Sequence, residues 1–363
     1  MLRTIRNGLL PLVALLSIAA LAACGSDNKA KTTPTTPGSG ATAVTAASTP
    51  KVSTTKPATS GTKVRVGFSA WPGWFPWEVA KEAGIFDEVG VNVDLVYFEG
   101  YLDSINALAA GKLDANAQTL NDTIGSVAAG SDQVIVLVND NSTGNDQIIV
   151  TSDIKTVADL KGKKIGVESG VVDQFLLQLG LEANGLKADD LQITPLETGA
   201  AAAAFSAGQL DGVGVFAPFT TQAMERTGAH VLFSSKDYPG AIPDHLTFAR
   251  SFVDAHPDDV QKVVEAWFKT LAYIKANPAK AVDVMSKRAG VTADEYKSYD
   301  AGTTIFTVAQ NVEAFGPGTT YKSLQYAAGQ IAQFMLDFKL IEQKPDLTKL
   351  FDPSFVQKYS AGP

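Results

Sequence analysis

The stretch KVRVGFSAWPGWFPWEVAKEAG, residues 63–84, decides the fold class of this chain. Valine and phenylalanine alternate with polar or small residues over residues 64–68, which predicts a half-buried strand. The run breaks at residues 71–73, after which Pro76 suits the first position of a helix that ends at Gly84. Strand, tight turn and helix in succession are typical of α/β sheets that bind ligands at the carboxyl ends of their strands. We therefore expect this turn, with its tryptophans, to form part of a binding cleft.

The first 23 residues are identified as a secretory signal peptide. Two arginines precede an apolar run over residues 9–21, and this run is shorter than the ~20 residues that span a membrane. The sequence Leu-Ala-Ala-Cys at residues 21–24 resembles the lipobox of bacterial lipoproteins, in which cleavage leaves a diacylated cysteine. We expect Cys24 to anchor the protein to the outer face of the cell membrane. The alternative is an ordinary signal peptide followed by a chance cysteine.

Composition excludes several classes of protein. Residues 24–62 are mostly small, polar or proline residues and are expected to form a disordered tether. Cys24 is the only cysteine, so no disulfide stabilises the folded part. Removal of residues 1–23, which contain two arginines and no acidic residue, changes the formal charge from −8 to about −10. With no cluster of lysine and arginine, this acidic chain is not expected to bind nucleic acid.

An internal repeat indicates two lobes. The sequence ALAAGKLD at residues 107–114 recurs as AFSAGQLD at residues 204–211, 97 positions later, and a short strand is predicted after each copy. A strand at residues 163–168 followed by a helix repeats the pattern of residues 63–84. Two lobes of one βαβαβ design explain this repetition, although chance similarity of two α/β halves is the alternative.

The sequence after residue 243 predicts helices without strands of their own. Residues 257–277, 278–289 and 321–340 have helical spacing of apolar residues. Such helices must pack on a sheet formed by earlier residues, most simply that of the first lobe. Their aromatic residues are therefore expected in the core rather than at a site.

Five motifs in order carry a family resemblance: WPGWFP at 71–76, AGKLD at 110–114, DLKGKKIGVE at 159–168, NPAKA at 277–281 and LFDP at 350–353. In this order and spacing they resemble the nitrate/sulfonate/taurine (thiamine-pyrimidine-like) class of extracytoplasmic solute-binding proteins of ABC importers.

The resemblance implies a two-lobed α/β fold of the periplasmic-binding-protein type II. Residues 63–148 and 245–363 would form lobe 1 and residues 149–244 lobe 2, with hinge crossings near 146–152 and 240–248. It also implies a monomer that closes on a small solute and delivers it to a permease with ATPase subunits, without a cofactor or metal. The C-terminal helices would be additions to lobe 1.

The resemblance also places ligand groups on the turns that follow the strands of each lobe. The candidate ligand-binding residues are Trp71, Pro72, Gly73, Trp74, Gln118, Thr119, Asn121, Asp122, Asn145, Asp146, Glu168, Ser169, Gly170, Val171, Phe216, Pro218, Asp244 and His245.

Several of these assignments have alternatives. Trp71 and Trp74 are expected to form walls of the site, because rigid aromatic rings cover ligand surface at low entropic cost, but they could instead fill the lobe core. Thr119 contacts the solute or caps a helix. Gly170 would let backbone N–H groups approach a bound anion at a helix start, which a neighbouring carboxylate opposes. Asp244 contacts the solute or serves the hinge.

The candidate loops contain four acidic residues and no lysine or arginine. A receptor for a plain anion would be expected to use arginine, whose guanidinium pairs with sulfonate or carboxylate in a fork. The sequence therefore favours a neutral, amine-bearing or zwitterionic small organic molecule over nitrate.

Two rival functions remain. A pyrimidine-forming enzyme of thiamine synthesis is disfavoured because its cysteine cluster is missing, and the three histidines form no catalytic or metal-binding spacing. A receptor that senses the solute is not separable from a transport protein, because both use the same closure. We therefore expect no catalysis and leave transport and sensing open.

Overall fold

The turn that follows the first strand is built as the sequence predicts. The computed structural model describes residues 59 and 61–362. Strand β1 spans Lys63–Phe68 and helix α1 spans Pro76–Glu82, with proline at its first position. Gly84 follows with a φ of 71°, a left-handed conformation that is strained for residues with a side chain.

The predicted signal peptide, Cys24 and residues 24–58 of the predicted tether lie outside the described residues. The described residues belong to one compact unit. Within them, every helix is too short or too polar to cross a bilayer.

The first sheet has six strands in the order β11-β4-β10-β3-β1-β2. Strands β2, β1 and β3 are parallel, whereas β10 runs antiparallel between β3 and β4, and β11 pairs antiparallel with β4. Besides β1, its strands are β2 (Asn92–Tyr97), β3 (Ala115–Thr119), β4 (Gln133–Ser142), β10 (Pro243–Ala249) and β11 (Thr303–Ile305).

The second sheet has five strands in the order β7-β6-β8-β5-β9. Strands β7, β6 and β8 are parallel, and β5 runs antiparallel between β8 and β9. The strands are β5 (Asp146–Val150), β6 (Lys164–Val167), β7 (Gln192–Pro195), β8 (Gly212–Phe216) and β9 (His230–Ser234).

The two sheets share one plan, which explains the internal repeat. Each has three parallel strands, β2-β1-β3 or β7-β6-β8, followed by an antiparallel strand that arrives from the other half of the chain. Strand β10 arrives after β9 of the second sheet, and β5 arrives after β4 of the first. The predicted fold class, two βαβ halves joined by crossings, is confirmed.

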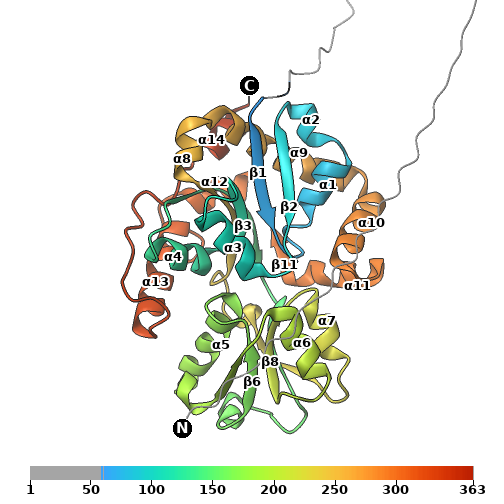
Figure 1. Ribbon diagram of the computed structural model, residues 1–363, viewed down its shortest axis with the longest axis vertical. Helices are drawn as coiled ribbons and strands as arrows, with labels where there is room; N and C mark the ends of the chain where they lie inside the picture. Colours follow the sequence, from blue (N-terminus) through green and yellow to red (C-terminus); the bar gives the residue numbers. More distant parts are fainter. Residues whose placement is uncertain (1–58, 60, 363) are drawn as a thin grey trace, which may run out of the picture. The chain divides into compact units, whose positions relative to one another are not determined.

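Helices cover both faces of each sheet (Figure 1). On the second sheet, α5 lies on one side and α6 and α7 on the other. The helices are α1, α2 (Ile85–Val89), α3 (Tyr101–Ala109), α4 (Leu120–Ala128), α5 (Val172–Ala183), α6 (Thr198–Ser206), α7 (Phe219–Met224), α8 (Arg250–Ala255), α9 (Pro257–Ala276), α10 (Pro278–Ala289), α11 (Ala293–Ser298), α12 (Val308–Phe315), α13 (Leu324–Asp337) and α14 (Ser354–Ala361), with short 3₁₀ turns at Val157–Leu160, Ala188–Asp190, Ser235–Asp237 and Tyr299–Gly302.

The C-terminal helices pack on the first sheet and its helices, as predicted. Helix α9 contacts α1 and α2, and α12 and α14 contact β4. Trp267 of α9 is fully buried, with its ring centroid 4.7 Å from that of Trp77 in α1. The aromatic residues of α9 thus belong to the core.

Three strands, β9, β10 and β11, were not predicted. Strand β10 contains a proline, an aspartate and a histidine, which hide the apolar alternation of a central strand. Strand β11 has three residues and is too short to show a period. The predicted lobe boundaries at residues 148 and 244 fall inside β5 and β10, within the predicted hinge crossings at 146–152 and 240–248. The division into lobes itself stays a prediction.

Candidate functional site

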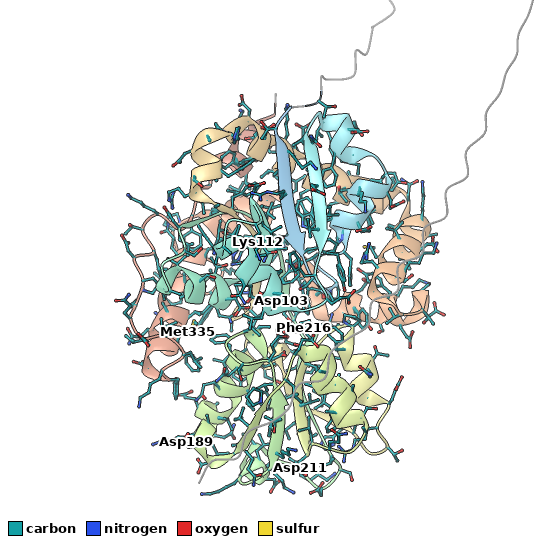
Figure 2. All side chains as sticks on the ribbon, in the orientation of Figure 1. Asp103, Lys112, Asp189, Asp211, Phe216 and Met335 are labelled. Carbon is teal, nitrogen blue, oxygen red and sulfur yellow. The ribbon has the colours of Figure 1, made fainter. Side chains whose placement is uncertain are left out.

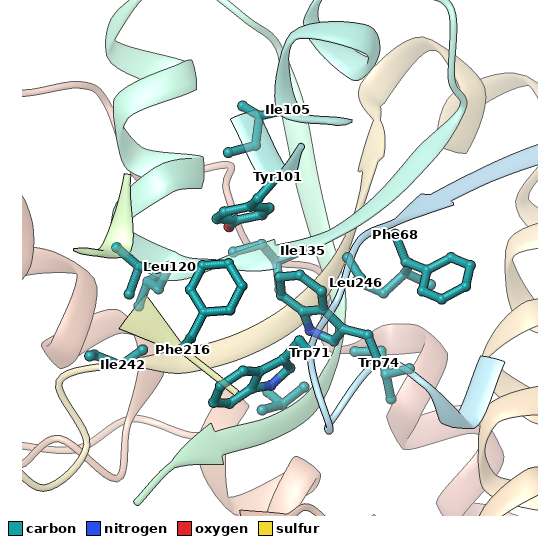
Figure 3. Close-up of a cluster of buried hydrophobic side chains, with 14 of the residues drawn as sticks. Phe68, Trp71, Trp74, Tyr101, Ile105, Leu120, Ile135, Phe216, Ile242 and Leu246 are labelled. Atoms are coloured by element: carbon teal, nitrogen blue, oxygen red, sulfur yellow. The ribbon is translucent and has the colours of Figure 1, made fainter. Parts of the chain in front are cut away.

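Four aromatic rings meet where the two sheets approach each other (Figure 3). The ring centroids of Trp71 and Trp74 are 6.4 Å apart, those of Trp74 and Tyr101 5.3 Å, those of Tyr101 and Phe216 6.1 Å, and those of Phe216 and Trp71 6.3 Å. The four distances close a circuit, which we call the aromatic box (Trp71, Trp74, Tyr101 and Phe216). Three of its members follow strands of the first sheet, and Phe216 ends β8 of the second.

The aromatic box encloses a small cavity. Its volume accessible to the centre of a water molecule is about 10 Å³, which is room for about one water. Besides the box, the cavity is lined by Ala70, Thr119, Asp146, Val172 and Asp244. Both sheets therefore contribute to its wall.

Asp140 of β4 holds the turn that carries the tryptophans. Its Oδ1 accepts a hydrogen bond of 2.9 Å from Nε1 of Trp71. The backbone of Gly73 lies directly over this carboxylate, because a Cβ atom at Gly73 would come within 1.8 Å of Oδ2 of Asp140. Only glycine allows that approach. Gly73 therefore has a positioning role.

Two further carboxylates line the cavity without a partner for all of their oxygens. Oδ2 of Asp146 and both carboxylate oxygens of Asp244 receive no hydrogen bond from the described residues. The carboxyl of Asp140 lies within hydrogen-bonding reach of that of Asp244. Burial raises the pKa of Asp140 and of Asp146 to about 7, and it raises the pKa of Asp244 well above its usual value.

A compact network orients Tyr101 and Thr119. The hydroxyl of Tyr101 donates to Oδ2 of Asp122 at 2.7 Å and accepts from the backbone N–H of Thr119 at 2.8 Å. Burial raises the pKa of Asp122 to about 7, although hydrogen bonds from Thr119 and Tyr101 lower it. Thr119 occupies the N-cap position of α4, yet its hydroxyl contacts Asp122 and Asn121 rather than a helix N–H. Thr119 is therefore the N-cap residue of α4 by position, but its side chain makes no capping hydrogen bond.

Gln118 and His245 lie in the core rather than on the cavity. They are partners in the register of β3 and β10, and both side chains bond to Thr123 of α4, at 2.6 Å and 2.8 Å. Burial lowers the pKa of His245 to about 3, so the imidazole is neutral at physiological pH. Their position gives these two residues a role in the fold of the first sheet.

Glu168 connects the two halves of the protein. It follows β6 of the second sheet and accepts the backbone N–H of Leu102 in α3, which packs on the first sheet, at 3.1 Å. It also accepts the N–H and hydroxyl of Thr198, at 3.2 Å and 2.6 Å. Burial raises the pKa of Glu168. We call Glu168, Leu102 and Thr198 the latch; it lies beside a separate opening, away from the aromatic box.

In the loop after β6, the N–H group of Gly170 has a partner within the chain. The N–H of Gly170 donates to Oε1 of Gln174 at 2.7 Å, so it is not free for a ligand. Ser169 lies at the opening beside the latch, and Val171 is the N-cap of α5. It is the next residue, Val172, that lines the cavity.

Three other candidates make structural contacts. The carbonyl of Pro72 accepts a hydrogen bond of 3.1 Å from the hydroxyl of Tyr296. Nδ2 of Asn145 donates to the carbonyl of Tyr299 and to Oγ1 of Thr303, each at 2.7 Å, and so ties β5 to β11. Pro218 is the N-cap of α7.

The structure thus brings together Trp71, Trp74, Thr119, Asp146, Phe216 and Asp244 of the candidates around one cavity. Sequence reasoning missed Tyr101, Asp140 and Ala70. Tyr101 opens the helix after β2, so the rule that ligand groups follow strands could have found it. Asp140 lies within a strand and carries no such signal. No group of potential metal ligands occurs among the described residues.

Solved structures share this architecture. The periplasmic aliphatic sulphonate-binding protein of Escherichia coli superposes with a TM-score of 0.66 at 25% identity, covering 80% of this chain and 98% of that protein. The periplasmic nitrate-binding protein of Synechocystis PCC 6803 gives 0.69 at 14% identity, covering 84% and 90%. A desulfurization enzyme, DszB, shares the fold with a TM-score of 0.56 at 16% identity, covering 82% and 99%. The fold is that of the periplasmic binding proteins of type II.

Sequence comparison assigns the family. The NMT1-like family matches residues 57–288. A protein named as a binding protein in Brucella abortus is 30% identical over 235 residues, covering 62% of this chain and 70% of that protein. The taurine-binding periplasmic protein of Escherichia coli is 26% identical over 254 residues, covering 67% and 78%. The chain belongs to the NMT1-like family, and it is a solute-binding component of an ABC import system.

Proposed function

We propose that this protein captures a small organic solute between its two sheets and hands it to an ABC permease on the outer face of the cell membrane. The observation that carries this proposal is the shared cavity. Trp71 and Asp244 line it from the first sheet, and Asp146 and Phe216 line it from the second. A solute in contact with both would favour the closed arrangement through its differential affinity.

Small-angle scattering tests closure directly. The chain without its signal peptide is first screened by thermal shift against sulfonates, amino acids, nitrate, pyrimidines and polyamines. Saturation with a hit should reduce the radius of gyration. A hit that stabilises the protein without compaction would contradict capture by closure.

Transport and sensing are separated by uptake. Deletion of the gene should abolish uptake of the solute identified by the screen, and a plasmid copy should restore it. Unchanged uptake in the deletion strain would instead favour a sensory receptor of the same fold.

The membrane anchor is proposed from the sequence alone. Cys24 follows a lipobox-like run, and residues 25–62 would hold the folded part away from the headgroups. Mass spectrometry of the mature N-terminus should find a diacylated cysteine. A Cys24→Ser protein should leave the membrane fraction, and an unmodified Cys24 in the wild type would refute the anchor.

We also propose that the protein binds its solute without converting it, unlike the desulfurization enzyme that shares the fold. His245 is buried, neutral and bonded to Thr123 outside the cavity, and the ring of His256 packs on Phe252. A bound solute recovered from the purified protein after prolonged incubation should be chemically unchanged.

A further inference from the structure

The cavity combines an aromatic enclosure with buried carboxyl groups that have no positive partner among the residues lining it. The aromatic box surrounds it with ring faces and edges from both sheets. Asp146 and Asp244 are 3% and 1% exposed and line the cavity; Oδ2 of Asp146 contacts no donor among the described residues, and the carboxyl of Asp244 has only that of Asp140 within hydrogen-bonding reach. Buried carboxyl oxygens normally have a hydrogen-bond partner, so this arrangement leaves a place for a partner from outside the chain.

That partner carries positive charge. The residues that line the cavity include no lysine or arginine, and the groups that face Asp244 are the carboxyls of Asp140, Asp146 and Asp122. None of these carboxyls supplies the positive charge that a buried anion would need. The partial positive charge at the N-termini of α4 and α5 does not make the cavity suitable for an anion, because Asp122 and Asp173 already occupy the first turns of these helices.

We infer that the aromatic box and the carboxylates of Asp146 and Asp244 bind a small organic cation, with its ammonium group between the rings and the two carboxylates. This inference rests on the proposed function, since it names the class of solute. Aromatic faces attract cations through their quadrupole, and alkylated ammonium groups gain most because they are weakly hydrated. The carboxylates supply the counter-charge that a buried cation needs.

The geometry also limits the size of the cation. The closed cavity holds about one water, so the sheets must separate to admit a ligand and close again around it. The ring centroids stand 5.3–6.4 Å apart, which is a contact distance for aromatic pairs, so the rings must also spread to hold one ammonium group with short substituents. A long polyamine would extend beyond the box.

Isothermal titration calorimetry with matched probes tests the charge requirement. Choline and tetramethylammonium carry a permanent cation, 3,3-dimethylbutan-1-ol is the neutral carbon isostere of choline, and methanesulfonate is an anion. We expect at least one of the two cations to bind at least ~30-fold tighter than the neutral isostere, and methanesulfonate not to bind. Indole fluorescence should change on binding, because two tryptophans line the site.

Two pairs of variants locate the binding. Asp244→Asn should weaken binding of the cation at least ~10-fold, whereas Asp189→Asn, the same change at an exposed position remote from Phe216, should not (Figure 2). Phe216→Leu should weaken it similarly, whereas Phe338→Leu, whose ring packs on Phe334, should not. Thermal denaturation of each variant separates loss of binding from loss of the fold.

The outcomes distinguish this inference from the proposed function. Binding of the neutral isostere as tight as that of both cations, or unchanged binding of the cation by Asp244→Asn, would overturn the inference. Compaction with a sulfonate and none with a cation would also overturn it, while capture by closure would stand. Compaction with no solute of any charge would contradict the proposed function itself.

Discussion

The latch should control how readily the protein closes. Replacing Glu168 with alanine removes the carboxylate that accepts the N–H of Leu102 at 3.1 Å, which is a hydrogen bond from the first sheet's half to the second. The hydrogen bonds from Thr198 to Glu168 lie within the half that carries the second sheet, so they are present in both the closed and the open arrangement. They therefore do not affect the closed–open equilibrium. Of the hydrogen bonds that Glu168 makes to described residues, only the one to Leu102 joins the two halves.

The expected size follows from that single bond. A hydrogen bond to a charged group contributes ~1.5–3 kcal/mol, and the lower figure applies because opening returns both groups to water. Since ~1.4 kcal/mol is a factor of ten, Glu168→Ala should shift the closed–open equilibrium about tenfold toward open. Where the free protein is mostly open, the measured Kd should rise by the same factor.

The assay is titration of the solute together with small-angle scattering of the free and bound protein. Glu197→Ala is the matched control, because that carboxylate caps α6 through the N–H groups of Gly199 and Ala200 and bonds only within its own half. The control should lose stability without loss of affinity. Equal affinity of Glu168→Ala and Glu197→Ala, within about threefold, would refute the latch.

Three further predictions follow from buried contacts near the site. Gly73→Ala places a Cβ 1.8 Å from Asp140, so it should displace the tryptophan turn and weaken solute binding at least ~10-fold. The control is Gly329→Ala, whose Cβ meets nothing within 4 Å and which should stabilise its helix by ~0.5–1 kcal/mol. Equal affinity of the two variants for the solute would contradict the positioning role of Gly73. Gln118→Ala should lower the free energy of unfolding by ~1–3 kcal/mol, because it leaves the buried side chains of Thr123 and Gln133 without a partner. The affinity of the folded protein for the solute should not change. A loss of affinity without a loss of stability would instead place Gln118 at the ligand. Asp122, Asp140 and Asp146 have pKa values of about 7 in the folded protein, against the usual 3.8. Between about pH 4 and 7 these carboxyls are therefore protonated in the folded protein and ionised in the unfolded chain. The free energy of unfolding should fall as the pH rises through that window. Asp244→Asn should therefore stabilise the ligand-free protein in urea unfolding more at pH 7.5 than at pH 4.5, and an equal gain at both values would contradict the raised pKa.

The sequence predicted the elements whose signals are local. The alternation over residues 64–68, the proline at the first position of α1 and Gly84 after it predicted strand, turn and helix, because hydrophobic period and backbone conformation depend on neighbouring residues. The internal repeat predicted two related halves for the same reason. The sequence also shows that the candidate loops contain no lysine or arginine, and from this absence we expect an amine-bearing ligand.

The tertiary structure alone decided which candidates share a cavity. Trp71 and Phe216 are 145 positions apart in the chain, yet their rings are 6.3 Å apart because β1 and β8 end at the same edge between the sheets. Gln118 precedes Thr119 by one residue but points into the core, because successive side chains of a strand face opposite sides. The support that Asp140 gives to the tryptophan turn, and the bond of Glu168 across the two halves, join distant segments, and no local pattern encodes such a contact.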